Sequence, residues 1–269
     1  MTPRAVHGAA LRWHAAAHEA VVVEVQSARG SVPRDAGTRM LVAADEVLGS
    51  IGGGHLELQA IATARQLLRH GGTPKDQPVA LGPSLGQCCG GALTLRFTDL
   101  AANDLQHWPL PPVLFELQLY GAGHVGRAIV NLLRDIDCSV RWIDEREDEF
   151  PRTPLPAHIE KVCAEPGRVE VTRAAPGTFY LVLTHSHDLD LAISLAILQR
   201  GDFGYFGLIG SATKRARFEH RLVERGIAPT VLARMVCPIG LPGLPGKQPE
   251  VLAVSVVAQL LMQPAAIAR

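Results

Sequence analysis

The second half of the chain alternates apolar strand-like segments with helical ones, and this alternation restricts the fold more than any other sequence feature. Strands are predicted at residues 113–120, 139–144, 178–184 and 205–209, and helices at 123–136, 189–199 and 213–225. A regular strand–helix order is typical of a parallel sheet with helices on both faces. The sequence therefore predicts an α/β fold, with a Rossmann-like doubly wound domain in this half.

A glycine-rich turn joins the first strand of this half to its first helix. Gly121, Gly123 and Gly126 have the spacing that permits a tight turn, close approach of a phosphate and packing of helix on strand. Asp144 ends the next strand, where such folds place the acid that binds a ribose. Together with His124 at the mouth of the turn, these residues predict a nucleotide site. The alternative is a Rossmann-like domain that has lost nicotinamide binding or holds another phosphate ligand.

The first half is predicted to be a separate, mixed α/β domain. Strands are expected at residues 20–26, 38–43 and 92–97, and an amphipathic helix at 55–70. Three prolines between Trp108 and Pro112 are incompatible with a continuing helix or a central strand. We therefore predict domains at residues 1–108 and 113–269, joined by a proline-rich linker at 109–112.

Two loops of the first half are candidates for anion binding. Arg34 follows a constrained Gly–Ser–Val–Pro turn, and a guanidinium held in this way suits bidentate contact with an anion. Gly52, Gly53 and Gly54 precede the predicted helix, and their backbone N–H groups are of the kind that cradle a phosphate. The alternative is that both loops are ordinary tight turns.

Two adjacent cysteines lie in a third loop, between glutamine and two glycines. Cys88 and Cys89, followed by Gly90 and Gly91, have little secondary structure predicted around them. Thiolates are soft ligands, so the pair suits sulfur-rich or transition-metal chemistry. The alternative is a packed pair of small residues.

A histidine-rich segment, THSHDLD, follows the third strand of the second half. The His185–Ser186–His187 spacing suggests a metal hydrolase, but Asp188 and Asp190 lie one and three residues after His187 rather than two. We therefore expect Asp188 to cap the following helix, and the segment to line a ligand pocket.

Charge and cysteine content exclude several classes of protein. The chain of 269 residues carries 26 basic and 26 acidic side chains, so it offers no basic footprint for nucleic acid or for a polybasic membrane contact. The first 20 residues lack the apolar core of a secretory signal, and polar residues interrupt the apolar stretch at 251–268. Five cysteines without a C-x-x-C pair favour reduced thiols. We expect a cytoplasmic protein with no membrane or nucleic-acid partner.

Motifs spread in order along nearly the whole chain resemble those of the XdhC/CoxI family. These motifs are GSVPRDAGTRMLV, LGSIGGGHLE, LGQCCGG, YGAGHVGRA, LTHSHDLD, GLIGSATKRARF, CPIGL and KQPEVLAVSVVAQLL. The resemblance implies an accessory protein of molybdenum hydroxylases, a carrier rather than a catalyst. It would hold the molybdenum cofactor while a cysteine desulfurase supplies sulfur, and then insert it into the molybdenum subunit of apo-xanthine dehydrogenase.

On this basis each predicted site residue acquires a role. Arg34, Gly52, Gly53, Gly54, His55, Gly90 and Gly91 would cradle the cofactor, and Cys88 or Cys89 would lie near molybdenum, with Cys89 as the expected ligand. The turn at Gly121–Gly126, with His124, Asp144, His185 and Ser211, would form a second nucleotide-type pocket or a docking surface. An NAD(P)-dependent oxidoreductase and a non-catalytic scaffold remain as rival functions. A homodimer remains an open alternative to a monomer.

Overall fold

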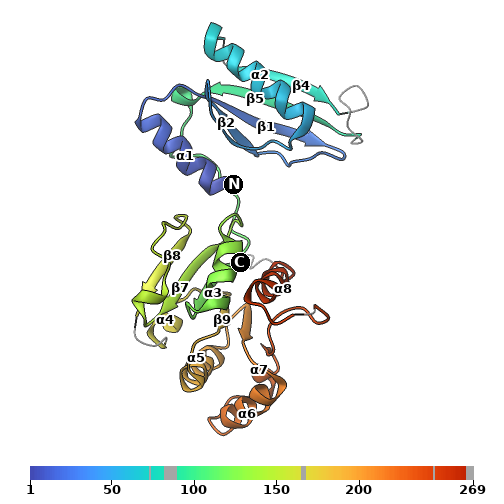
Figure 1. The fold of residues 1–269 in the computed structure, drawn as a ribbon. Coiled ribbons are helices and arrows are strands. Elements are labelled where there is room, and N and C mark those ends of the chain that lie inside the picture. The colour runs from blue at the N-terminus through green and yellow to red at the C-terminus, as the bar shows by residue number, and fades with distance from the viewer. Residues whose placement is uncertain (73, 82–89, 165–167, 245, 265–269) are drawn as a thin grey trace. The chain divides into compact units, whose positions relative to one another are not determined.

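The computed structural model describes residues 1–72, 74–81, 90–164, 168–244 and 246–264. It divides into two compact units, residues 1–112 and 113–269 (Figure 1). Arg4 and Arg39 donate hydrogen bonds to the carbonyl oxygens of Pro111 (2.7 Å) and Pro109 (3.3 Å), respectively. These bonds attach the proline-rich stretch to the first unit.

The first unit is a five-stranded antiparallel sheet with two helices. Its elements are α1 (Pro3–Ala15), β1 (Val21–Arg29), β2 (Arg39–Val42), β3 (Val47–Gly49), α2 (Gly54–His70), β4 (Lys75–Ala80), β5 (Ala92–Asp99) and the short 3-10 helix η2 (Leu100–Ala102). The strand order is β3-β2-β1-β5-β4, so β1 is central. Because β1 pairs with both β2 and β5, the loop after β1 and the loop before β5 meet at one end of the sheet.

Both faces of this first sheet are covered, which explains why β1 begins with three consecutive valines. Val21, Val23 and Val25 pack in one core with Leu56 of α2. Val22 packs in a second core, on the α1 side of the sheet. A strand buried on one face alone would alternate apolar and polar residues.

The second unit is the predicted doubly wound α/β domain. Its elements are β6 (Glu116–Tyr120), α3 (His124–Leu133), β7 (Ser139–Asp144), the 3-10 helix η3 (Glu147–Glu149), β8 (Ile159–Cys163), α4 (Arg168–Arg173), β9 (Phe179–Val182), α5 (His187–Arg200), β10 (Tyr205–Leu208), α6 (Ala212–Val223), α7 (Pro229–Leu232), β11 (Met235–Val236) and α8 (Pro249–Leu261). All strand pairs in its sheet are parallel, in the order β11-β10-β9-β6-β7-β8. The predicted α/β fold class is confirmed.

Helices cover both faces of the second sheet. On one face, α3 and α8 pack over a core that includes Leu119 and Trp142. On the other, α5 and α6 pack over Tyr180 and Phe206. The chain winds in one direction from β6 to β8 and in the other from β9 to β11, so the direction changes between β6 and β9. Open α/β sheets bind ligands outside the carboxyl ends of their strands at such a point.

The structure contains elements that periodicity does not predict. The alanine-rich α1 and the edge strands β4 and β8 are not among the predicted elements, and β6 and α3 are shorter than predicted. Pro78 in β4 and the Glu160–Lys161 pair in β8 are unusual inside a central strand, and both strands lie at sheet edges. Within the described part of the chain, no helix combines the length and hydropathy needed to cross a bilayer.

Candidate functional site

A narrow cleft of about 20 Å³ lies in the second unit at the carboxyl ends of β6, β7 and β9. Its lining includes Gly121, Asp144, Glu145, Thr184 and His185. Three of these are residues predicted for a nucleotide-type pocket, so the fold brings Gly121, Asp144 and His185 together from three separate strand ends.

The glycine turn has the geometry that its spacing predicts. Gly121 has φ of +119°, and a Cβ there would lie 2.3 Å from the carbonyl oxygen of Leu183. A Cβ on Gly126 would lie 2.1 Å from the carbonyl oxygen of Gly121. No atom lies within 4 Å of a Cβ built on Gly123, so the turn is crowded toward the sheet and open above Gly123.

Asp144 is buried beside this turn, and its carboxylate is saturated with hydrogen bonds. Its Oδ2 accepts from the backbone N–H of Ala122 (2.6 Å) and from Nη2 of Arg146 (2.9 Å). Its Oδ1 accepts from the N–H and Nε of Arg146, both at 3.0 Å. Burial raises the pKa of Asp144, but the hydrogen bonds from Arg146 and the two amides outweigh it and hold the pKa below its ordinary value.

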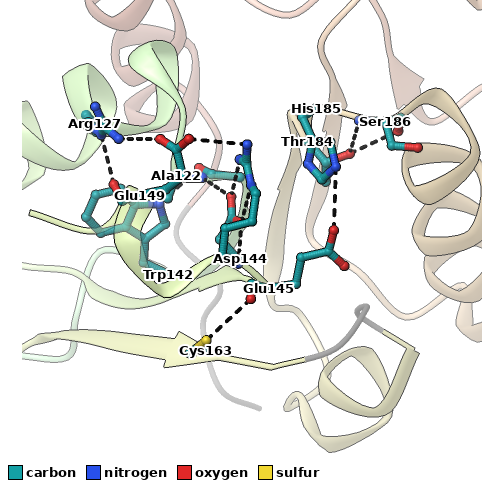
Figure 2. A network of polar contacts seen from close by, with 12 residues as sticks. Ala122, Arg127, Trp142, Asp144, Glu145, Glu149, Cys163, Thr184, His185 and Ser186 are labelled. Atoms are coloured by element: carbon teal, nitrogen blue, oxygen red, sulfur yellow. Dashed lines mark hydrogen bonds and ion pairs between the residues drawn. The ribbon is translucent and has the colours of Figure 1, made fainter.

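This arrangement gives Asp144 a different role from the predicted one. A carboxylate has about four acceptor positions, and four donors already fill those of Asp144. Figure 2 shows the network continuing, because Arg146 also reaches Glu149 (3.3 Å) and Glu149 pairs with Arg127. Asp144 therefore fixes the glycine turn to β7, and a ribose would have to displace Arg146 to reach it.

The side of the cleft formed by β9 carries the histidine-rich segment. Nε2 of His185 lies 3.5 Å from Oε1 of Glu145, which follows Asp144 (Figure 2). Ser186, not Asp188, is the N-cap of α5, and its hydroxyl accepts from the N–H of Leu189. The predicted cap at Asp188 is wrong because the strand ends at Val182 and the helix begins at His187, each two residues earlier than expected.

Two other predicted residues of this unit lie outside the cleft. His124 is exposed at the start of α3 and lines a different hollow with Arg127 and Glu250. Ser211 caps α6, where its hydroxyl accepts from the N–H of Lys214 (3.2 Å).

In the first unit, the three predicted loops meet at one end of the sheet. A Cβ on Gly52 would lie 2.6 Å from Pro33 and 3.7 Å from the side chain of Arg34. A Cβ on Gly91 would lie 2.4 Å from the carbonyl oxygen of Ser31. The loop that contains Arg34 thus contacts both the triple-glycine loop and the loop before β5.

Two of the three backbone amides predicted to cradle an anion, those of Gly52 and Gly53, are already bonded within the chain. Oε2 of Glu57 accepts from the N–H groups of Ile51 (3.0 Å) and Gly53 (3.1 Å) and from the Ser50 hydroxyl (2.6 Å). The N–H of Gly52 donates to the same hydroxyl at 3.2 Å. The chain's own carboxylate therefore occupies the position expected for a phosphate.

The remaining predicted residues of this unit differ in how far the structure describes them. Arg34 and His55 are exposed, and His55 contacts Gln59 at 2.9 Å. Gly90 is exposed, with no atom within 4 Å of a Cβ built there. Cys88 and Cys89 lie outside the described residues. Among the described residues, no group of three His, Cys, Asp or Glu side chains is arranged to hold a metal ion.

Comparison with known proteins identifies the family. The model described as the XdhC Rossmann domain matches residues 117–260, and that described as the XdhC and CoxI family matches residues 13–76. The chain belongs to the XdhC and CoxI family. The predicted family is confirmed, and the glycine turn, Asp144 and α6 all lie inside the matched XdhC Rossmann domain.

Two relatives show how far this XdhC/CoxI similarity extends. Uncharacterized protein YqeB of Escherichia coli (strain K12) is 30% identical over 253 residues, covering 89% of this chain and 42% of YqeB. The chain thus spans less than half the length of that relative. A Bacillus halodurans crystal structure described as a xanthine dehydrogenase superposes with a TM-score of 0.75 over 97% of this chain and 95% of its own. At 18% identity, this second likeness shows the fold alone.

The sequence analysis did not predict three charged residues whose hydrogen bonds hold the loops of this XdhC/CoxI structure. Glu57 lies within the quoted GGGHLE motif, and its position one helical turn after the triple glycine was the available signal. Lys214 lies in GSATK, and its Nζ donates to the fully buried Asp190 (2.5 Å) and to the carbonyl oxygen of Ile209 (2.8 Å). Arg146 had no comparable sequence signal.

Proposed function

We propose that this chain is an accessory protein of molybdenum hydroxylases that holds the molybdenum cofactor and transfers it to an apo-enzyme. Membership of the XdhC and CoxI family supports the accessory role. The meeting of three loops at one end of the first sheet, around Arg34, Gly52 and Gly91, supports cofactor binding in the first unit. The client would be the molybdenum subunit of xanthine dehydrogenase, and a cysteine desulfurase would supply sulfur to the bound cofactor.

The residues at these loops fit a phosphate-bearing cargo with one change from the sequence prediction. Because Glu57 occupies the amides of Ile51 and Gly53, the phosphate would be bound by the exposed Arg34 guanidinium. The positions above Gly53 and Gly90 are open, so a flat pterin can approach the backbone there. Cys88 and Cys89 precede Gly90 in the chain and would supply a thiolate to molybdenum, a soft partner for sulfur.

An exposed site of this kind suits a carrier. A single unburied guanidinium gives a modest contribution to affinity, and a cargo that must be released is not enclosed. The chain's net charge of zero means that attraction for the cofactor is local rather than long-range.

The rival function, an NAD(P)-dependent oxidoreductase, would use the cleft of the second unit. That reaction requires an acceptor for the ribose hydroxyls, and the four hydrogen bonds to Asp144 already use its acceptor positions. The geometry therefore favours the carrier.

The decisive experiment is titration of the purified chain with molybdenum cofactor under anaerobic conditions. Arg34→Ala is expected to raise Kd roughly tenfold, the value of one charge-assisted hydrogen bond. Cys88→Ala/Cys89→Ala is expected to weaken binding and to shorten the lifetime of the bound cofactor. Arg69→Ala, an exposed cation at the far end of α2, is the matched control and should change Kd less than twofold.

Two results would contradict the proposal. Unchanged affinity and lifetime in both variants would remove these loops from cofactor binding. Absence of cofactor binding by the wild-type chain, with capture of the apo-enzyme and desulfurase retained, would indicate a scaffold instead.

A further inference from the structure

A hollow of about 610 Å³ lies in the second unit where α5 and α6 begin, separate from the cleft around Asp144. Its volume falls in the range typical of small-molecule sites. Five of its nine lining residues are basic or histidine, and the described lining contains no acid; the five are His187, Lys214, Arg217, His220 and Arg221. The lining thus offers three cations and no carboxylate, although acids just outside it pair with Lys214, His220 and Arg221.

Arg217 carries the cation of this hollow that no acid neutralises. It is exposed, and the described part of the chain provides no hydrogen-bond or ion-pair partner for its guanidinium. Lys214 is committed to the buried Asp190. Arg221 lies 3.5 Å from Asp188, but the Asp188 side chain is 87% exposed, so water screens that pair strongly.

The groups around Arg217 are arranged along one face of α6. Thr213, Arg217 and Arg221 recur at four-residue intervals, which places them on one side of the helix about 6 Å apart. Thr213 is also exposed, without a side-chain partner among the described residues, and it lies in the first turn, where backbone N–H groups lack intrahelical acceptors. His187 reaches the same hollow from the start of α5.

The helix dipole at this position is not compensated by the chain itself. The first turn of α6 contains no acidic residue, which is also true of α1 and α3. A hydroxyl, free helix amides and arginines at successive turns are the groups that bind neighbouring phosphates.

We infer that this hollow is a second ligand site, which binds a pyrophosphate-containing molecule through Arg217, Thr213 and Arg221. The inference is independent of cofactor binding at Arg34, because it concerns residues of the second unit alone. The pyrophosphate group can come from a free nucleoside diphosphate or from a dinucleotide. Both present the same charged group to α6.

Calorimetric titration of the full chain with inorganic pyrophosphate, ADP, NAD⁺ and adenosine tests this inference. Wild type is expected to bind pyrophosphate and at least one of the two nucleotides, and to ignore adenosine. Arg217→Ala should raise Kd at least tenfold, and Arg217→Lys should restore part of the loss. Comparing ADP with NAD⁺ then distinguishes a free nucleotide from a dinucleotide.

Two control variants keep the test specific. Arg225→Ala removes an exposed cation from just beyond α6, outside the hollow, and should change Kd less than twofold. Arg34→Ala removes the same charge from the first unit and should also leave Kd unchanged. Failure of wild type to bind pyrophosphate at millimolar concentration would overturn the inference. An equal rise in Kd for Arg217→Ala and for either control variant would also overturn it. A rise in Kd for Arg34→Ala alone would do the same.

Discussion

The two glycine-rich turns of this molecule, at Gly52–Gly54 and Gly121–Gly126, are both held by a carboxylate of the chain itself. In the first unit, Glu57 accepts from the N–H groups of Ile51 and Gly53. In the second, Asp144 accepts from the N–H of Ala122. Glycine turns before helices are commonly interpreted as phosphate cradles, yet here an internal anion satisfies part of each turn.

The two turns differ in the space around their glycines and in whether a cation pairs with the carboxylate that holds them. A Cβ on Gly121 or Gly126 would lie 2.3 or 2.1 Å from a backbone oxygen. In the first turn, a Cβ on Gly52 would meet the Pro33 side chain at 2.6 Å, and a Cβ on Gly53 would meet no atom within 4 Å. Asp144 is buried and paired with Arg146, while no ion pair is recorded for Glu57 among the described residues. The second turn is thus buried and confined by backbone atoms, and the first is a more exposed loop.

Gly126→Ala tests the crowding of the second turn and should have the largest effect. The added Cβ would meet the Gly121 carbonyl oxygen, which is backbone and cannot rotate away. We expect a loss of roughly 3 kcal/mol in the free energy of unfolding of the second unit. Chemical denaturation followed by fluorescence in a Trp13→Phe/Trp108→Phe background, which leaves Trp142 as the one tryptophan, measures it. A loss below about 1 kcal/mol would show that the turn relaxes easily.

Asp144→Asn tests the buried carboxylate that is paired with Arg146. It should lower the free energy of unfolding by about 2–3 kcal/mol at neutral pH. The folded pKa of Asp144 is below its unfolded value, so its contribution is present above the unfolded pKa, near 4. The contribution is then lost as pH falls through the folded pKa. The stability difference between wild type and variant should therefore shrink on acidification.

Glu149→Gln is the matched control for this pH series. Glu149 also contacts Arg146, but its side chain is 34% exposed, so the expected loss is below about 1 kcal/mol. If the two variants lost equal stability, the burial of Asp144 would not be the reason for its effect.

Glu57→Ala tests the carboxylate of the first turn and should lower the free energy of unfolding of the first unit by about 1–2 kcal/mol. The amides of Ile51 and Gly53 lose their acceptor, so their hydrogen exchange should accelerate while β1 stays protected. Gln59→Ala, on the exposed side of the same helix, should leave both rates unchanged. Unchanged exchange in Glu57→Ala would mean that water or another group holds the turn.

These contrasts also show what the sequence can predict. The strand–helix alternation and the spacing of Gly121, Gly123 and Gly126 identify the second unit, because both follow from local periodicity and from steric limits on glycine. The position of Asp144 at the end of β7 was also predictable. Two of its four donors were not, because they belong to the guanidinium of Arg146 and depend on the conformation of that side chain.

The first unit was harder to predict for physical reasons. Its edge strand β4 contains Pro78 and is half exposed, so it lacks the pattern of a buried strand. The loops at Arg34 and Gly52 have the sequence pattern of separate turns, and only the pairing of β2 with β1 and with β3 brings them together. The role of Glu57 was not predictable, because a glutamate in the first turn of a helix is also common as an ordinary surface residue.

Gly53→Ala is the counterpart of Gly126→Ala and should have the smallest measurable effect. Gly53 has φ of +76°, a conformation that costs a residue with a Cβ about 1–2 kcal/mol, but no atom lies within 4 Å of the new methyl group. Part of that cost is offset because alanine reduces the conformational entropy of the unfolded chain. We expect a loss near 1 kcal/mol in the first unit. Gly90→Ala, at an equally open position without positive φ, should be neutral within about 0.5 kcal/mol. If both alanines were equally costly, the loss at Gly53 would not arise from its backbone conformation, and the contrast between an open and a crowded glycine turn would fail.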